Sequence, residues 1–557
     1  MKEIMSFDVK NPLIIQSDGT ILLEADNPKF HEARELLSGF AHLEKCPEHI
    51  HTYSITPLSL WNAKTIGLSA ETIISSLENY TKYPIPSNII ADIKEISGRF
   101  GKIELVKAEN RLKLQTEDKF LLSQLAKNPL VCDFIEQENE EYFVKEKFRG
   151  VLKQKFIDLN YPINDIAGFT DGEDYDIKML EIGRDKLPFI LRNYQKSAVD
   201  SFIGNDNLRG GSGVVVLPCG AGKTIVGIKT MATIRKKTLI LVTNITAAHQ
   251  WKREILNRTN LQSHEIGEYS GEQKEIKPVT IATYQILTYR KDKEDDFLHF
   301  SIFNSQDWGL IIYDEVHLLP APVFKFTAEI QARRRLGLTA TLIREDNLQT
   351  DVFALIGSKK FDVPWKNLEK EGWIAAAKCV EIRVELDETS KLNYLSLQKR
   401  EQVRIAYENK NKIPVVADLL KKHKGEKILI LGQYIEQIDL YGEKFGAPVI
   451  KGNTKNVERD ALYERFRNGD LNVLVLSRVG NMAVDLPDAN VAIQVSGMFG
   501  SRQEEAQRLG RILRPKRNGS QAIFYSVVTR DSAELEFAMK RQIFLAEQGY
   551  PYEIVYE

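Results

Sequence analysis

The segment 214–224, Val-Val-Val-Leu-Pro-Cys-Gly-Ala-Gly-Lys-Thr, constrains the fold of this chain most. An apolar, β-branched run stops at a proline, a loop with two glycines follows, and a helical pattern begins at Lys223. This order of strand, glycine loop and helix is the context of a phosphate-binding loop. Backbone N–H groups at Gly220, Ala221 and Gly222 would approach the phosphates, and the helix N-terminus would favour their negative charge.

Two polar side chains at the start of the predicted helix complete this loop. Lys223 would reach the β- and γ-phosphates of a nucleotide, and the hydroxyl of Thr224 would hold Mg²⁺. The loop departs from the full pattern at Leu217, where a glycine usually stands six residues before the lysine. A turn that joins strand to helix and binds nothing is the alternative, and the rest of the chain decides between the two.

The bulk composition indicates a folded chain of several domains without a dominant charge. Its 557 residues exceed what one core organises, and 43% of them are hydrophobic. The 76 Lys and Arg residues balance 77 Asp and Glu residues, so a nucleic-acid site would be a local groove. The four cysteines form no Cys-x-x-Cys pair, which argues against a zinc module and favours a reducing, cytoplasmic location. We expect neither a signal peptide nor a membrane-spanning stretch.

Short, continuous apolar runs alternate with helical stretches from residue 181 onward. Runs of this length are typical of parallel strands that are buried on both faces of a sheet in α/β domains. The expected strands are 238–243, 309–313, 336–341, 427–431, 472–476, 490–495 and 521–527. The segment is too long for one sheet and breaks near 364–372, so we predict two α/β lobes, at 181–364 and 365–557.

The first 180 residues predict two smaller domains. Helical patterns and one strand-like run occur at 27–40, from Ser69, at 86–98 and at 102–106. Residues 1–98 therefore fit a small helical, winged-helix-like accessory domain, and a helical packing domain without a ligand is an equal alternative. Residues 99–180 predict a small α+β domain and a linker, in which the charged stretch 136–155 is expected to form a solvated helix.

A second motif, Leu-Ile-Ile-Tyr-Asp-Glu-Val-His at 310–317, places two carboxylates at the end of a predicted buried strand. Open parallel sheets bind ligands at the carboxyl ends of their strands. Asp314 is placed to hold Mg²⁺ there, and Glu315 is placed to orient or deprotonate the attacking water. A solvated corner is the alternative, but the order of the two motifs favours nucleotide hydrolysis. For His317 and Thr339-Ala-Thr341, coupling to the rest of the molecule and plain structural packing both stay open.

A third motif, Gln-Arg-Leu-Gly-Arg-Ile-Leu-Arg at 507–514, puts Gln507, Arg511 and Arg514 on one face of a helix. Two guanidinium groups on one face suit the charge that spreads over a transferring phosphoryl group. They lie in the second predicted lobe, so they would complete the site when the two lobes close. A basic surface helix is the alternative, although it leaves Gly510 inside the helix unexplained.

Together these motifs resemble the series found in superfamily 2 helicases. More narrowly, Leu-Thr-Ala-Thr-Leu-Ile-Arg-Glu-Asp at 338–346 resembles the XPB helicase family, as do 477–490 and 500–514. Residues 62–106 look like the family's N-terminal domain and the start of its damage-recognition-like domain. The resemblance implies two tandem RecA-like lobes, the cofactors ATP and Mg²⁺, a DNA partner, and a single-chain form like that of bacterial and archaeal members.

The resemblance also implies roles for individual residues. Arg192 and Gln195 match the adenine-recognition motif, Asp485 matches the residue that holds the ribose, and Arg511 and Arg514 match the arginine fingers. The motifs that touch the DNA backbone contain Thr283, Gln433 and Ser477. The element that opens the duplex matches Arg344, Glu345 and Asp346.

The resemblance predicts an ATP-dependent DNA helicase or translocase of 3′–5′ polarity that acts on single-stranded or forked DNA in DNA repair, with a nuclease partner left open. The rivals are a duplex-DNA translocase without processive unwinding, a DNA-damage-binding clamp switched by ATP, and an RNA helicase, because backbone contacts barely distinguish the two sugars. The segment before Lys427 is short for the thumb-like insertion of archaeal relatives, which leaves the grip on duplex DNA open.

Overall fold

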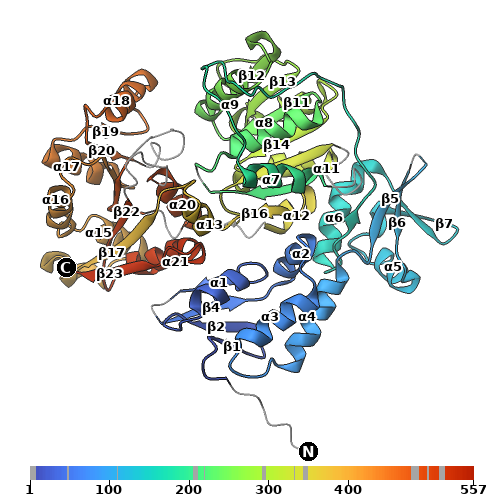
Figure 1. The fold of residues 1–557 in the computed structure, drawn as a ribbon, viewed down its shortest axis with the longest axis horizontal. Helices are drawn as coiled ribbons and strands as arrows, with labels where there is room; N and C mark the ends of the chain where they lie inside the picture. Colours follow the sequence, from blue (N-terminus) through green and yellow to red (C-terminus); the bar gives the residue numbers. More distant parts are fainter. Residues whose placement is uncertain are drawn as a thin grey trace, which may run out of the picture. The chain divides into compact units, whose positions relative to one another are not determined.

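The computed structural model of the chain contains two compact units (Figure 1). The first comprises Met1–His42, His49–Leu217 and Gly222–Asp362, and the second comprises Leu43–Glu48, Pro218–Ala221 and Val363–Glu557. The structure describes residues 8–46, 49–109, 111–204, 211–218, 220–291, 297–330, 333–342, 349–477, 489–497, 501–512 and 521–557. The side chains of 456, 502–504, 507 and 511 are outside this description.

A seven-stranded parallel sheet organises the C-terminal part of the first unit. Its strand order is β12-β13-β11-β14-β15-β10-β16, and every described pair is parallel. The strands are β10 (Ser212–Val216), β11 (Thr238–Val242), β12 (Ile266–Tyr269), β13 (Val279–Thr283), β14 (Leu310–Asp314), β15 (Arg334–Thr339) and β16 (Lys359–Asp362). The helices are α7 (Asn193–Ile203), α8 (Lys223–Ile234), α9 (Ile245–Arg258), α10 (Tyr284–Leu287), α11 (Ala321–Glu329) and α12 (Gln349–Leu355), with short 3₁₀ turns at Ser263–Glu265, Phe300–Asn304 and Val316–Leu318.

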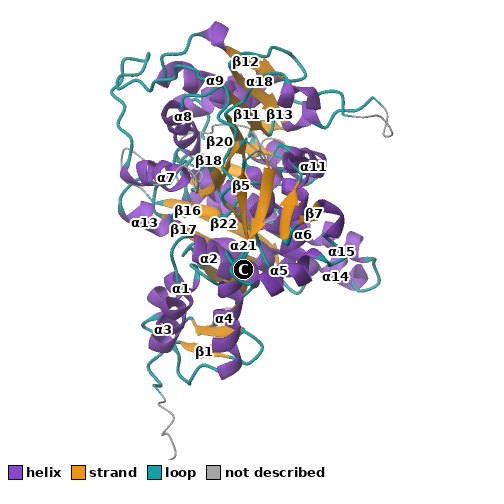
Figure 2. Ribbon diagram, turned by 90° about the vertical axis from the view of Figure 1, so that its right-hand side faces the viewer, coloured by secondary structure: helices purple, strands orange, loops and turns teal. Residues whose placement is uncertain are grey.

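A second seven-stranded parallel sheet organises the second unit, in the order β19-β20-β18-β21-β22-β17-β23. The strands are β17 (Ala377–Val384), β18 (Ile428–Leu431), β19 (Val449–Ile450), β20 (Val473–Leu476), β21 (Val491–Gln494), β22 (Ala522–Thr529) and β23 (Tyr552–Tyr556). The helices are α13 (Trp365–Lys370), α14 (Glu388–Tyr394), α15 (Lys399–Tyr407), α16 (Lys412–Lys422), α17 (Ile435–Phe445), α18 (Asn456–Asn468), α20 (Arg502–Ile512) and α21 (Ala533–Glu547). Figure 2 shows strands in orange among purple helices.

The two parallel sheets confirm the α/β class predicted from the apolar runs. All five residues of β11 and all four of β18 are buried. A parallel strand covered by helices on both faces needs apolar side chains at successive positions, and this is why the strands appear in the sequence as continuous runs. Each of the seven expected strands lies within one or two residues of an observed one.

The first hundred residues form helices packed with a sheet of short strands in the order β1-β2-β4-β3. The strands are β1 (Leu13–Ile15), β2 (Thr20–Glu24), β3 (His42–Lys45) and β4 (Ile50–Ser54), and the helices are α1 (Phe30–Leu37), α2 (Pro57–Thr65), α3 (Ala70–Tyr80) and α4 (Ser87–Arg99). The hydroxyl of Ser69 caps α3 by accepting from the Thr72 N–H, as predicted. The sheet and α2, which begins with a Thr56–Ser59 capping box, were not predicted.

A five-stranded sheet follows, in the order β7-β8-β6-β5-β9. Its elements are β5 (Glu104–Ala108), β6 (Arg111–Gln115), α5 (Lys119–Ala126), β7 (Ile135–Glu138), β8 (Glu141–Val144), α6 (Arg149–Asp158) and β9 (Asn164–Asp165), with 3₁₀ turns at Cys132–Phe134 and Glu146–Phe148. The expectation of one helix over 136–155 is wrong, because its first part is the hairpin of β7 and β8. Asn139 and Glu140 have φ of 47° and 65°, which is the left-handed backbone that a two-residue hairpin turn requires. The limits of the smaller domains remain a prediction.

Within the first unit, the N-terminal elements pack directly against the parallel sheet. Trp61 of α2 and Ile157 of α6 belong to the same buried cluster as residues of β10 and β14. The Lys359 N–H of edge strand β16 donates to Oδ1 of Asn62 at 3.0 Å. Gln154 of α6 donates to Asp351 of α12 at 2.9 Å. The apolar core of this lobe is therefore completed by residues far upstream in sequence.

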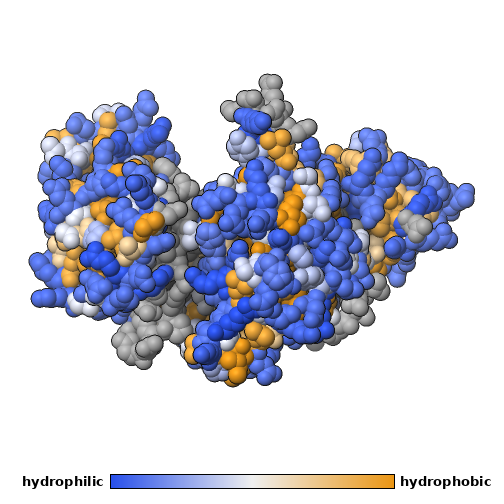
Figure 3. All heavy atoms as spheres, turned by 90° about the horizontal axis from the view of Figure 1, so that it is seen from above, coloured by the Kyte–Doolittle hydropathy of each residue, from blue (hydrophilic) through white to orange (hydrophobic). Residues whose placement is uncertain are grey.

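Hydrophilic side chains dominate the face of the molecule that Figure 3 shows. The face in Figure 3 is mainly blue, with apolar residues in small separate groups. No helix among the described residues is both long and apolar enough to cross a membrane.

Candidate active site

The glycine loop lies where the sequence predicts it, between β10 and α8. Gly220 and Gly222 have φ of 81° and 84°, a left-handed backbone that favours glycine. A Cβ on Gly222 would lie 2.6 Å from Nε2 of Gln195, so a larger residue would displace the Gln195 amide as well as strain the backbone. Leu217 is buried, and its N–H donates to the Thr339 carbonyl at 3.0 Å, so hydrogen bonding to β15 extends one residue past β10, to the position where the usual pattern has glycine.

The phosphate-loop lysine and the second carboxylate of the Asp-Glu pair form an ion pair. Nζ of Lys223, the first residue of α8, lies 2.9 Å from Oε1 of Glu315. Glu315 follows β14 with φ of 47°, which turns its side chain out of the strand direction. Burial raises the pKa of Glu315, but the Lys223 ammonium and His317 outweigh burial, so its pKa lies below the ordinary value. Within the described chain, Oε2 of Glu315 accepts no hydrogen bond.

Asp314 is held by a tryptophan that the sequence analysis missed. The indole N–H of Trp251 on α9 donates to Oδ2 of Asp314 at 2.9 Å, and the Glu315 N–H donates to Oδ1 at 3.2 Å. Burial and the adjacent Glu315 carboxylate raise the pKa of Asp314 to about 6. Two adjacent, partly buried carboxylates with one lysine fit a site for an additional cation. A buried aromatic carries no sequence signal of such a role.

His317 connects the Asp-Glu strand to the next strand of the sheet. Its Nδ1 lies 2.6 Å from Oγ1 of Thr339 and 3.5 Å from Oε2 of Glu315. The Thr339 hydroxyl donates to the Thr341 carbonyl, so its single proton is used and His317 Nδ1 must be the donor. The Thr341 N–H donates to the same hydroxyl at 3.1 Å. His317 is therefore a buried, hydrogen-bonded histidine that also touches the candidate water-activating carboxylate.

The predicted adenine-recognition residues lie at the start of α7. Gln195 is buried, and its Oε1 accepts from the Arg192 N–H at 3.1 Å. The Arg192 guanidinium donates to the Tyr194 hydroxyl at 2.9 Å. Since Gln195 also lies against Gly222, this motif and the phosphate loop are brought together.

The three predicted DNA-backbone residues stand at carboxyl ends of strands, where Thr283 and Ser477 are buried and Gln433 is half-buried. Thr283 ends β13 and caps α10 through its hydroxyl, which accepts from the Ile286 N–H at 3.4 Å. In the second unit, Gln433 and Ser477 follow the neighbouring parallel strands β18 and β20. Within the described chain, Oε1 of Gln433 and Oγ of Ser477 are buried without a hydrogen-bond partner.

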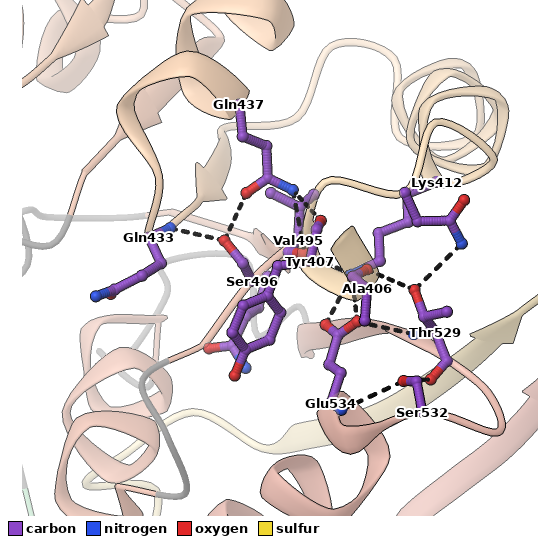
Figure 4. A network of polar contacts seen from close by, with 12 residues as sticks. Ala406, Tyr407, Lys412, Gln433, Gln437, Val495, Ser496, Thr529, Ser532 and Glu534 are labelled. Atoms are coloured by element: carbon purple, nitrogen blue, oxygen red, sulfur yellow. Dashed lines mark hydrogen bonds and ion pairs between the residues drawn. The ribbon is translucent and has the colours of Figure 1, made fainter. Parts of the chain in front are cut away.

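A polar network fixes the loop that carries Gln433 (Figure 4). The Gln433 N–H donates to Oγ of Ser496 at 2.7 Å, and Ser496 donates to Oε1 of Gln437 at 2.6 Å. Gln437 in turn donates to the Tyr407 carbonyl at 2.6 Å. Close by, the buried Lys412 ammonium bonds both Glu534 carboxylate oxygens, at 2.7 and 2.8 Å. The backbone after β18 is thus held by the Ser496 side chain, which Gln437 and the Tyr407 carbonyl fix in turn.

Several predicted site residues lie outside the described part of the chain. Backbone positions 507 and 511 are on α20, so the helix expected for this motif is present, but the side chains of Gln507 and Arg511 are not described. The predicted site residues outside the description are Arg344, Glu345, Asp346, Asp485 and Arg514.

The fold and the described site define an ATPase motor of two tandem RecA-like lobes, the architecture of superfamily 2 helicases. The family model "ERCC3/RAD25/XPB C-terminal helicase" matches 368–557, "Type III restriction enzyme, res subunit" matches 188–344, and "Helicase conserved C-terminal domain" matches 13–138. The "DNA 3'-5' helicase XPB" of Mycobacterium tuberculosis is 51% identical over 98% of this chain and 97% of its own length. The chain belongs to the XPB family of DNA helicases.

More distant relatives agree with this assignment. The XPB protein of Kineococcus radiotolerans is 49% identical over 98% of this chain and 96% of its own. The "General transcription and DNA repair factor IIH helicase/translocase subunit XPB" of Encephalitozoon cuniculi is 33% identical over 98% of this chain and 83% of its own. The solved structure "ATP-dependent Type ISP restriction-modification enzyme LlaBIII bound to DNA" matches at 14% identity with a TM-score of 0.51, over 67% of this chain and 31% of that chain, which speaks for the fold alone.

Proposed function

We propose that this chain is an ATP-dependent DNA helicase of 3′–5′ polarity that couples ATP hydrolysis to movement on single-stranded or forked DNA, in DNA repair. The observation that carries the proposal is the pairing of Lys223 with Glu315 beside Asp314, at the carboxyl edge of a parallel sheet. A lysine for phosphates and a carboxylate for water are thereby adjacent, as phosphoryl transfer to water requires.

The residues of the first lobe divide the chemistry among them. Lys223 would move from Glu315 to the β- and γ-phosphates, which frees the carboxylate to orient and deprotonate the attacking water. Thr224 and Asp314 would hold Mg²⁺, which when bound neutralises charge on the phosphates. Arg192 and Gln195 would contact adenine. The proposed contributions of the second lobe are Asp485 to the ribose and Gln507, Arg511 and Arg514 to the transferring phosphoryl group.

Coupling to DNA would run through the strand ends. The 3.5 Å contact between Glu315 and His317, followed by the hydrogen bonds of Thr339 with His317 and Thr341, supports a path by which the water-activating carboxylate senses the loop after β15. Thr283, Gln433 and Ser477 would contact the DNA backbone, which requires their buried polar atoms to become accessible when DNA binds. Arg344, Glu345 and Asp346 would open the duplex.

Two assays test the proposal together. ATP hydrolysis is measured without nucleic acid and with single-stranded DNA, duplex DNA and RNA, and strand displacement is measured on duplexes with a 3′ or a 5′ tail. We expect stimulation by single-stranded DNA and displacement only with the 3′ tail. DNA-stimulated hydrolysis without displacement would favour a translocase, nucleotide-dependent DNA binding without turnover would favour a clamp, and stimulation by RNA alone would overturn a DNA enzyme.

Three variants separate the roles in these assays. Lys223→Ala should abolish turnover by weakening phosphate binding, and Arg511→Ala should retain ATP binding but lose hydrolysis by at least a hundredfold. Lys229→Ala, on the same helix α8, is the matched control and should leave turnover unchanged. Normal hydrolysis by Lys223→Ala would contradict the assigned site. A nuclease partner stays a prediction from the family resemblance alone.

A further inference from the structure

A cavity of about 450 Å³ lies in the first unit at the opposite edge of the sheet from the phosphate loop. Ser212, which begins β10, lines the cavity, whereas the phosphate loop follows the other end of that strand. The N-terminal residues Lys64 and Phe100, the α6 residue Lys153, and Lys360 of β16 also line it. The cavity is therefore formed jointly by the two N-terminal regions and the first lobe, and it is separate from the ATP site.

The cavity wall has more positive than negative charge. Lys64, Lys153 and Lys360 line it together with a single carboxylate, Asp165. That carboxylate already accepts two hydrogen bonds from the Arg149 guanidinium, at 2.8 and 2.7 Å, and one from Lys153 at 3.2 Å. The wall therefore carries an excess of cations over anions, a balance that favours binding of an anion.

Of the lysines that line the cavity, Lys360 has the fewest polar partners for its ammonium group within the described chain. Among the described residues, its ammonium forms neither a hydrogen bond nor an ion pair, although burial lowers its pKa. The neighbouring Lys359 instead pairs with Asp362 at 2.8 Å. Burial also lowers the pKa of Lys153 to about 7, because nearby Arg335 and Arg149 reinforce the effect of burial against Asp165. An anion beside these two lysines would offset the cost of burying them.

Aromatic rings form the apolar part of the same wall. Phe100 and Phe353 both line the cavity and meet edge to face, with ring centroids 6.0 Å apart. Phe169 lines it as well, and its ring lies beneath the guanidinium of Arg335 at 5.5 Å. Pockets for small ligands combine such apolar walls with a few charged groups, and 450 Å³ lies within their usual range of roughly 300–1,000 Å³.

We propose that this cavity binds a small phosphate-bearing ligand with a flat ring, of the mononucleotide class, with its phosphate against Lys153 and Lys360 and its ring against Phe100. The ligand would contact α2, α6 and β16 at once. Binding would therefore strengthen the attachment of the N-terminal regions to the ATP-binding lobe.

Binding of AMP and of inorganic phosphate to the full chain tests the proposal. Both are titrated calorimetrically into the unsubstituted chain and into the Lys223→Ala variant. In the variant the ATP site contributes little to binding. We expect AMP to bind in both, Lys360→Gln to weaken AMP at least tenfold, and the matched control Lys359→Gln to leave it unchanged. Phe100→Leu should weaken AMP but not phosphate.

Photolabelling then locates the ligand. The 8-azido derivative of AMP should label peptides containing 99–101 or 353–360, not the segment around Gln195. Failure of AMP to bind, equal affinity in Lys360→Gln, or labelling confined to 192–195 would each overturn the proposal. If phosphate bound as tightly as AMP, and Phe100→Leu weakened neither ligand, the ligand would not be a nucleotide and the cavity would be a site for phosphate alone. None of these outcomes depends on helicase activity, so the two proposals fail independently.

Discussion

The indole N–H of Trp251 on α9 donates to Oδ2 of Asp314, the last residue of β14, at 2.9 Å. The same ring is fixed on its other side by Gly227 of α8, where a Cβ would lie only 2.4 Å from the indole. The tryptophan therefore links the helix of the phosphate loop to the carboxylate of the Asp-Glu pair. Groups that orient a metal-binding carboxylate in this way influence metal affinity and rate.

Trp251→Phe keeps a ring at this position but removes the donor. We expect kcat for ATP to fall about 10- to 100-fold, with a higher Mg²⁺ requirement, because the Asp314 carboxylate loses its fixed orientation. Trp373→Phe is the control, since the Trp373 indole donates to the exposed Glu371. ATPase rates over a range of Mg²⁺ concentrations measure both effects, and an unchanged Mg²⁺ dependence would argue against the proposed role of Trp251.

Thr339→Val removes the hydroxyl that His317 contacts at 2.6 Å. We expect hydrolysis without DNA to persist while its stimulation by single-stranded DNA falls about tenfold, because the path between Glu315 and the loop after β15 is broken. The ratio of the two ATPase rates is the measurement. Thr339→Ser retains the hydroxyl and should restore the ratio; if it does not, packing of the methyl group rather than the hydrogen bond is responsible.

Low pH should destabilise the N-terminal region through His51. This histidine is buried against Phe30, and burial together with the Arg34 guanidinium lowers its pKa to about 4. Because the folded pKa lies below the unfolded value of about 6.5, the stabilisation is complete above pH 6.5 and is lost as pH falls toward 4. At pH 5 the loss amounts to about 2 kcal/mol. Melting curves at pH 7.5 and 5 should show a smaller shift for His51→Phe than for the unchanged chain.

The neighbouring His31 provides the control for this pH effect. It is exposed and also packs against the Phe30 ring, with centroids 5.3 Å apart. His31→Phe should therefore keep the full pH dependence. Equal pH dependence in His31→Phe and His51→Phe would show that another group titrates.

The buried pair of Lys412 and Glu534 should make the second unit sensitive to loss of either charge. Both side chains are almost fully buried. Lys412→Met removes the ion pair of the Glu534 carboxylate, which keeps the hydrogen bond from the Thr529 N–H and the longer-range attraction of Arg541, at a cost of about 3–5 kcal/mol. The double variant Lys412→Met with Glu534→Leu should recover most of this loss. Calorimetric unfolding of the three proteins checks the order, and a double variant less stable than Lys412→Met would contradict it.

The sequence predicts the two lobes well because their strands are buried on both faces and therefore appear as continuous apolar runs. The N-terminal sheet was missed because β1 to β4 contain only three to five residues each, too few to show a period. The charged composition of 136–155 favours a solvated helix, whereas the segment begins with the hairpin of β7 and β8. The left-handed backbone of Asn139 and Glu140, which makes the hairpin turn, has no comparably strong signal in the sequence.

Candidate site residues can be proposed from the sequence where chemistry fixes spacing along the chain. Lys223 and Thr224 follow the glycine loop directly, and Asp314 ends β14 with Glu315 next to it. Trp251 was not predictable, since its role depends on α9 packing beside β14 and any buried aromatic gives the same sequence pattern. The sequence also does not indicate the excess of lysines around Asp165, because Lys64, Lys153 and Lys360 are far apart in the chain and come together only in the fold.

The contact between Asn62 and the Lys359 N–H has a consequence for how this chain can evolve. It covers the backbone of β16, the last strand of its sheet, while Trp61 fills the core beneath. An uncovered edge strand is a template for pairing with a second copy. A descendant that lost the residues before α7 would expose the β16 edge of this lobe to pairing with other chains. We therefore expect the N-terminal regions and this lobe to be retained together in evolution.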